Sequence, residues 1–214
     1  MAECDGNHVA FFWDPWKEWS ALRNIKGERA RGLFKILECR KTVLFRCDRC
    51  SRERGRKDAA LRPNQIFAVS LPETALDAKQ QRAVVDVCAR ELLTLFGLRS
   101  LGQNEAGYCG HYGGGIEDRD DAYHQGTVWG WLLGPFAFAH LRVYGNPQQA
   151  NSFLEPMFGQ IKFAGLGTLS EIFDGDPPHV PNGCIAQAWT VGEVLRAWKN
   201  IAKECEKEDG KLRK

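Results

Sequence analysis

The chain has 214 residues, of which 43% are hydrophobic and 26% charged, and its formal net charge is +2. This balance is typical of a globular protein with one sizeable core or two small ones, and so small a charge argues against nucleic acid or an anionic membrane surface as a partner. No apolar run approaches the ~20 residues that a spanning helix needs, and the N-terminus lacks the apolar block of a secretory signal. We therefore expect a cytoplasmic protein with no nucleic-acid and no membrane partner.

Residues 1–57 are rich in arginine and lysine and show no clear hydrophobic period. Within them, Cys47 and Cys50 have the spacing of metal ligands. A zinc site needs four ligands, and no second CxxC or HxxxH motif follows. We predict a poorly defined basic segment, with no metal and no cofactor.

The remainder of the chain, from about Leu61, shows helical periodicity. Residues 80–98 carry an apolar stripe that closes at Gly97, and residues 188–202 carry another. Between them, residues 127–144 are apolar almost all round, which predicts a buried helix. Residues 148–166 are a weaker candidate, because Pro156 and Gly159 interrupt them. No alternating strand of convincing length appears, so we predict an all-α fold with inner buried and outer amphipathic helices.

The first long loop, YCGHYGGGIEDRDDAYHQGTVWGW (108–131), is dense in glycine, aromatic rings and hydrogen-bonding side chains. Such a mixture suits a sugar, whose C–H face stacks on rings and whose hydroxyls need donors and acceptors. The alternative is a capping loop, with Asp120 or Asp121 as a helix N-cap and Trp131 in the core. We favour the sugar site.

The second long loop, EIFDGDPPHVPNGC (171–184), places three acids ahead of three prolines, which cannot continue a helix. Glu171 could be a helix cap. Asp174 and Asp176 could equally be turn residues around Gly175 or bind sugar hydroxyls. A calcium loop is a poor fit, because the oxygen ligands stop where the prolines begin.

Three runs resemble a known family. They are LRPNQIFAVSLP (61–72), RDDAYHQGTVWGWLLGPF (119–136) and LSEIFDGDPPHVPNGCIAQAWTVGEVLRAW (169–198). In this order they are similar to the C-terminal amylo-α-1,6-glucosidase domain of the glycogen debranching enzyme family. The resemblance covers residues 58–205 and leaves 1–57 and the charged tail 206–214 outside it. One departure is Gly130, where the family usually has proline.

The resemblance implies a fold and an activity. The fold would be an (α/α)6 toroid of six helical hairpins. The activity would be hydrolysis, with inversion, of α-1,6 branch points in glycogen or branched oligoglucans. Glu171 would be the general base that holds the attacking water, and it would lie ~6.5–9.5 Å from the carboxyl group of the general acid so that the water fits between them. The substrate-binding residues would be Arg119, Asp120, Tyr123, His124, Gln125, Trp129, Asp174, Asp176, Gln187 and Trp189.

The family's general acid lies in a GRD-containing motif, and residues 1–57 contain none. The predicted helices also amount to roughly half of a toroid. We therefore expect the C-terminal half of a glucosidase domain, inactive alone, with the missing half of the toroid as a potential partner. Two alternatives stay open: a non-catalytic glycogen-binding module, and an α-helical interaction protein.

Overall fold

A computed structural model of the chain describes residues 35–39, 42–46 and 60–212. The first two segments are strands β1 (Lys35–Cys39) and β2 (Thr42–Arg46), which pair antiparallel with Lys35 opposite Arg46. The Cys47–Cys50 pair and most of the basic segment lie outside the described residues.

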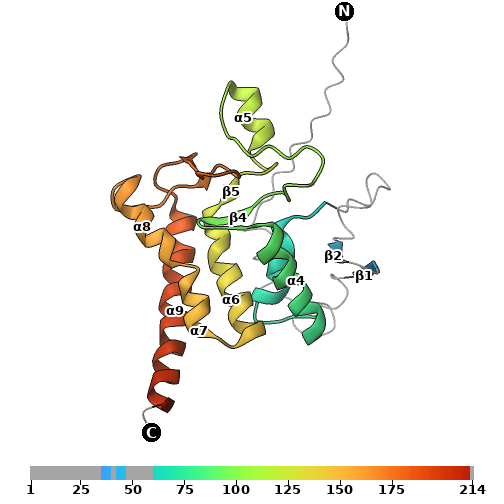
Figure 1. Cartoon of the computed structure of the whole chain (residues 1–214), viewed down its shortest axis with the longest axis vertical. Coiled ribbons are helices and arrows are strands. Elements are labelled where there is room, and N and C mark those ends of the chain that lie inside the picture. Colours follow the sequence, from blue (N-terminus) through green and yellow to red (C-terminus); the bar gives the residue numbers. More distant parts are fainter. Residues whose placement is uncertain (1–34, 40–41, 47–59, 213–214) are drawn as a thin grey trace, which may run out of the picture.

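The remaining segment is mostly helical, as predicted. Its helices are α3 (Phe67–Ser70), α4 (Ala78–Glu91), α5 (Ile116–Ala122), α6 (Leu133–Tyr144), α7 (Pro147–Ser152), α8 (Glu155–Phe163) and α9 (Ala188–Leu212), with 3-10 turns η1 (Pro63–Ile66) and η2 (Gly130–Leu132). Helix α6 is central, because it packs against α3, α4, α7 and α9 (Figure 1).

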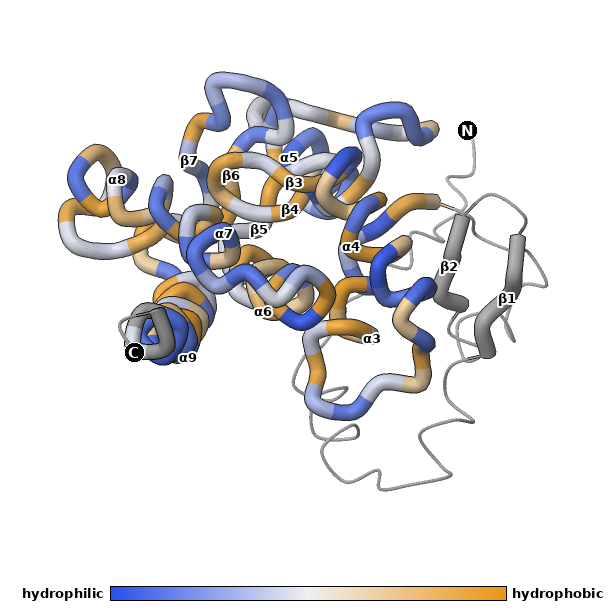
Figure 2. The backbone as a smooth tube through the Cα atoms, turned by 60° about the horizontal axis from the view of Figure 1, so that its bottom comes forward, coloured by the Kyte–Doolittle hydropathy of each residue, from blue (hydrophilic) through white to orange (hydrophobic). Residues whose placement is uncertain are grey.

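The burial of α6 confirms the predicted buried helix for residues 133–144, whereas the start of the predicted range, 127–132, is not α-helical. Leu133 and Ala137 face the cluster shared with α9, whereas Phe136 and Ala139 face the cluster shared with α4. Figure 2 shows the hydrophobic residues of α6 at the middle of the helical layer. A helix covered on two sides cannot be amphipathic, which explains the nearly continuous apolar sequence.

Helix α4 begins at a capping box, in which Asp77 and Gln80 satisfy each other's backbone N–H groups. It ends at Glu91, so the predicted stripe to Gly97 was too long. The chain beyond α4 forms a tight hairpin instead. An added Cβ at Gly97 would lie 2.3 Å from the backbone oxygen of Trp129, so only glycine allows the two backbones to approach.

The structure also contains a small antiparallel sheet that the all-α prediction lacked. Its strands, in spatial order, are β3 (Leu93–Thr94), β4 (Gly97–Arg99), β5 (Val128–Trp129), β6 (Ile172–Phe173) and β7 (Pro181–Asn182). Strands of two or three residues are too short to show an alternating pattern, which is why the sequence did not reveal them.

The sheet determines where the two long loops meet. It lies across one end of α6, and α5 projects beyond it (Figure 1). Strand β5 pairs with β6 in the register Trp129 opposite Ile172, so the loops 108–131 and 171–184 are brought side by side. The predicted glucan-binding residues therefore gather at one end of the helical layer.

The weak helix predicted over residues 148–166 is in fact two helices, α7 and α8. The Asn146 side chain accepts a hydrogen bond from the Gln149 N–H and caps α7. Pro156 lies in the first turn of α8, where its missing N–H is not needed. Among the described residues, none of the helices combines the length and apolarity that crossing a bilayer would require.

Candidate active site

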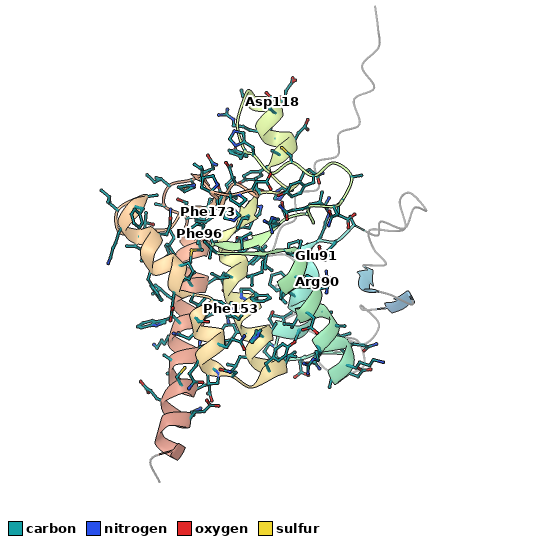
Figure 3. The ribbon with its side chains drawn as sticks, in the orientation of Figure 1. Arg90, Glu91, Phe96, Asp118, Phe153 and Phe173 are labelled. Carbon is teal, nitrogen blue, oxygen red and sulfur yellow. The ribbon has the colours of Figure 1, made fainter. Side chains whose placement is uncertain are left out.

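Glu171 immediately precedes β6, an inner strand of the sheet. Its backbone N–H donates to the oxygen of Cys184 at 2.9 Å, and its own oxygen accepts from the N–H of Gly130 at 3.4 Å. Two residues later, Phe173 stacks on Phe96 with ring centroids 4.8 Å apart (Figure 3). The backbone that carries Glu171 is thus held by three segments far apart in the sequence.

The carboxylate of Glu171 is half-buried and accepts from two N–H groups. The N–H of Cys184 binds Oε2 at 3.0 Å, and Nε2 of Gln187 binds Oε1 at 3.0 Å. A carboxylate offers about four acceptor positions, so capacity is left for a water molecule. An added Cβ at Gly183 would lie 2.5 Å from Oε2, and Gly183 has a φ of +70°. Glycine is required there for the carboxylate to occupy its place.

Tyr123 faces Glu171 from the other loop. Burial raises the pKa of Tyr123, and the hydrogen bond to Glu171 and its charge raise it further. The phenol is therefore neutral across the physiological range and serves as a donor to the carboxylate. Its ring contacts Tyr112, with ring centroids 5.9 Å apart.

His124 stacks on Trp129, with ring centroids 5.0 Å apart and an interplanar angle of 2°. Loss of solvent around the imidazole lowers the pKa of His124, as does the charge of Arg62, whereas Glu171 opposes them. Trp129 itself is buried, and its Nε1–H donates to the backbone oxygen of Tyr123 at 3.2 Å. The structure thus places Trp129 beneath His124.

Asp174 is buried, and both of its carboxylate oxygens are engaged within the chain. Oδ1 accepts from the N–H of Tyr112 at 3.0 Å and from Nδ2 of Asn182 at 2.8 Å. Oδ2 lies 2.9 Å from Nδ1 of His111. Asp174 was predicted either to stabilise the loop as a turn residue or to bind sugar hydroxyls, and these contacts favour a structural role within the loop.

Asp176 is exposed, and its Oδ1 accepts from the hydroxyl of Tyr108 at 2.8 Å and from Nε2 of Gln103 at 3.0 Å. The backbone oxygen of the preceding residue, Gly175, accepts from Nε of Arg99 at 2.9 Å. Asp176 therefore ties the second loop to the start of the first.

Arg119 and Asp120 lie on α5, whose N-cap is Gly115, so neither Asp120 nor Asp121 is the cap. The Asp118 carboxylate instead accepts from the Gly115 N–H at 2.8 Å. Figure 3 shows Asp118 on α5, well away from Phe173. Asp120 is exposed on this projecting helix.

Two open depressions flank the glycine-rich part of the first loop. One has a volume of about 530 Å³ and is lined by Tyr112, Gly113, Gly114, Arg119, Asn182 and Gly183. The other has a volume of about 480 Å³ and is lined by Gly107, Cys109, His111, Gly113, Asp118, Asp121, Ala122 and Gln125. Gly183, which lines the first depression, lies next to the Glu171 carboxylate.

Trp189 is half-buried and meets the buried Trp131 edge to face, with centroids 6.2 Å apart. Trp131 is thus a core residue, as expected. Gln187, predicted to bind substrate, uses Nε2 to hold Glu171 and places Oε1 3.4 Å from the Trp189 N–H. The geometry makes Gln187 a support for Glu171.

One residue of the site was missed by sequence reasoning. Arg62 donates to the backbone oxygens of Ser100 and His124 and to the side chain of Gln125. Arg62 belongs to the LRPNQ run, one of the three runs that carry the family resemblance, and this is the feature of the sequence that could have identified it.

The arrangement offers a supported carboxylate beside an open, ring-lined depression. Such a carboxylate can accept a proton from a water molecule that attacks a bound sugar. Within residues 60–212, no His, Cys, Asp and Glu side chains cluster as metal ligands. Among the known protein families, the model described as amylo-alpha-1,6-glucosidase matches residues 8–196 of the chain. The match covers the three runs that carry the resemblance, apart from residues 197 and 198. It also covers most of the basic segment 1–57.

Proposed function

This chain belongs to the amylo-alpha-1,6-glucosidase family, and from that premise we propose that its Glu171 site acts in the hydrolysis of α-1,6 branch points in glycogen or branched oligoglucans. The observation that carries the proposal is the Glu171 carboxylate, held by Cys184 and Gln187 at the edge of a depression lined by tyrosine, arginine and glycine. Glu171 is the general base of an inverting reaction.

The geometry supports this role through positioning. A base must hydrogen-bond its water and hold the water oxygen close to the anomeric carbon, and small displacements are costly. Glu171 is constrained at its backbone by Gly130 and Cys184 and at its carboxylate by two donors. The half-buried position also limits competing water.

The substrate would lie in the first depression, over the loop 108–115. Arg119 lines it and can donate to sugar hydroxyls, and Tyr112 supplies a ring. Tyr123 and His124 border Glu171, and Trp129 supports them from beneath. Asp120, Gln125, Asp176 and Trp189 stand as further contacts for a longer glucan.

We assign the proton donor to a carboxylic acid outside the loops 108–131 and 171–184. The helices of this chain would form the C-terminal half of an (α/α)6 toroid, and the other half would supply that acid. Purified chain is accordingly expected to bind oligoglucans weakly and to release no glucose. A cytoplasmic location is part of the proposal, and the free thiols of Cys88, Cys109, Cys184 and Cys205 in the described part of the chain are consistent with a reducing compartment.

A non-catalytic glucan-binding module is the second candidate. It is favoured by the two open depressions beside the glycine-rich loop, which can seat a glucan whether or not a proton donor is present. Under this candidate the chain would bind glucan with or without Glu171.

The test uses purified chain, titrated with maltooligosaccharides and with an α-1,6-branched limit dextrin while tryptophan fluorescence and glucose release are followed. A Glu171→Gln variant, built into an active enzyme that is completed with the missing half of the toroid, should lose ~10²–10⁴-fold in glucose release and keep glucan binding. Glu91→Gln, at the end of α4, is the matched control and should change neither. Absence of glucan binding by the parent chain, or equal turnover in the completed enzyme with and without Glu171→Gln, would refute the proposal.

A further inference from the structure

Arg62 joins the first sequence motif to the loop that faces Glu171. Its Nη1 donates to the backbone oxygen of His124 at 2.8 Å and to that of Ser100 at 3.1 Å, and its Nη2 donates to Oε1 of Gln125 at 3.0 Å. Three acceptors thus surround one planar guanidinium. Arginine presents its donors in a fixed fork, so this arrangement restrains orientation as well as distance.

The residues that Arg62 holds form the turn from Ala122 to Gly126, between α5 and β5. The same turn is fastened by Ser100, whose Oγ accepts from the Gly126 N–H at 2.9 Å. On its other side, the Cys109 N–H donates to the backbone oxygen of Gln125 at 2.6 Å. Removal of Arg62 would leave one flank of the turn without its principal donors.

The position of this turn decides where two aromatic residues lie relative to Glu171. Tyr123 and His124 are consecutive, and their rings meet edge to face with centroids 4.9 Å apart. Because His124 also stacks flat on Trp129, a rotation of the turn would break both ring contacts together.

We propose that Arg62 is a positioning residue for the glucan site: its fork fixes the 122–126 turn and so places Tyr123 and His124 beside Glu171. The link to glucan rests on the proposed function, whereas the positioning itself is a property of these contacts.

Charge distinguishes this role from that of a simple tether. The charged groups that bear on the His124 imidazole are Arg62, which lowers its pKa, and Glu171, which raises it. A residue that only held the loop would affect stability alone. Burial is the largest cause of the lowered pKa of His124, and the charge of Arg62 in the proposed role adds to it.

The experiment uses the full chain and three variants, Arg62→Gln, Arg62→Lys and Arg90→Gln. Arg90 is the matched control, because it is an exposed arginine that pairs with its neighbour Glu91 on α4. The pKa of each histidine is measured by NMR titration of the imidazole protons, and a His124→Gln variant identifies the His124 signal. Glucan affinity is measured in parallel by tryptophan fluorescence.

Arg62→Gln should raise the pKa of His124 toward its ordinary value near 6.5 and shift the amide signals of residues 122–126. Arg62→Lys keeps the charge but not the fork, so the pKa of His124 should stay low while the amide signals still move. Oligoglucan affinity should fall about tenfold in Arg62→Gln and less in Arg62→Lys. Arg90→Gln should match the parent throughout.

An unchanged pKa of His124 and unchanged amide signals in Arg62→Gln would overturn the proposal. Should Arg62→Gln fail to fold, Arg62→Lys decides: amide signals identical to those of the parent would overturn it equally. If the parent binds no glucan, the proposed function fails, whereas the NMR result still decides whether Arg62 positions the turn.

Discussion

The buried carboxylate of Asp174 accepts a hydrogen bond from the backbone N–H of Tyr112 at 3.0 Å, which joins two loops 62 residues apart in the sequence. The same oxygen accepts from Asn182, and both Tyr112 and Asn182 line the depression beside Glu171. The shape of that depression therefore depends on a residue that does not line it.

The first prediction concerns this anchor. Asp174→Ala would leave the half-buried donors on Tyr112 and Asn182 without their buried acceptor, so the free energy of unfolding should fall by about 2 kcal/mol. Asp176→Ala is the matched control, because Asp176 belongs to the same loop but is exposed, and its partners can bind water. Its cost should stay below about 1 kcal/mol. Urea denaturation measures both, and equal losses would contradict an anchoring role.

The second prediction concerns the glycine against the base. Gly183 and Gly145 both have positive φ, +70° and +64°, but an added Cβ meets Glu171 at the first and nothing within 4 Å at the second. Gly145→Ala should therefore cost only the backbone strain, about 1 kcal/mol. Gly183→Ala should cost more and displace the Glu171 carboxylate. Denaturation of both variants, with glucan titration, would show the difference; similar losses of stability and unchanged glucan affinity would count against the close contact.

The third prediction concerns pH. His140 on α6 is buried, its Nδ1 has no hydrogen-bond partner, and burial lowers its pKa, which the charge of Asp86 opposes. A histidine whose folded pKa lies below its unfolded pKa supports stability above about pH 6.5. That support is lost as the pH falls through the folded pKa, because the unfolded chain binds the proton more readily.

His140→Phe should therefore reduce the loss of stability between about pH 7.5 and pH 5, as measured by urea midpoints at each pH. The pKa of His124 is also lowered, so a His124→Gln variant shows how much of the loss belongs to that residue. A loss in His140→Phe as large as in the parent would mean that His140 does not titrate with folding.

The fourth prediction compares a tightly packed glycine, Gly130, with a glycine that has open space beside it, Gly192. An added Cβ at buried Gly130 would lie 2.7 Å from Cγ2 of Thr190 and 3.0 Å from Cε of Met157, whereas one at Gly192 would meet nothing within 4 Å. Gly130→Ala should destabilise the chain by about 1–3 kcal/mol through overpacking. Gly192→Ala, inside α9, should stabilise it by about 0.5–1 kcal/mol. Thermal denaturation tests the opposite signs, and a stabilising Gly130→Ala would show that the neighbours can relax.

The sequence alone determined the helical character of the chain and the family to which it belongs. The apolar surface of α6 and the amphipathic stripe of α9 follow from local periodicity, which a single sequence displays in full. The family follows from three ordered runs, and one of them contains Glu171, the candidate base. These features need no knowledge of which distant segments touch.

Only the tertiary structure revealed the sheet and showed which site residues make contacts within the chain and which remain open to a ligand. Strand β5 pairs with β6 through backbone groups 43 residues apart, between Trp129 and Ile172, and pairs of two residues leave no pattern in the sequence. Whether a carboxylate such as Asp174 faces a ligand or the chain depends on donors supplied by a distant loop. The same holds for Arg62, whose partners lie 38 to 63 residues away. Contacts between residues so far apart are set by packing, and a local pattern cannot encode them.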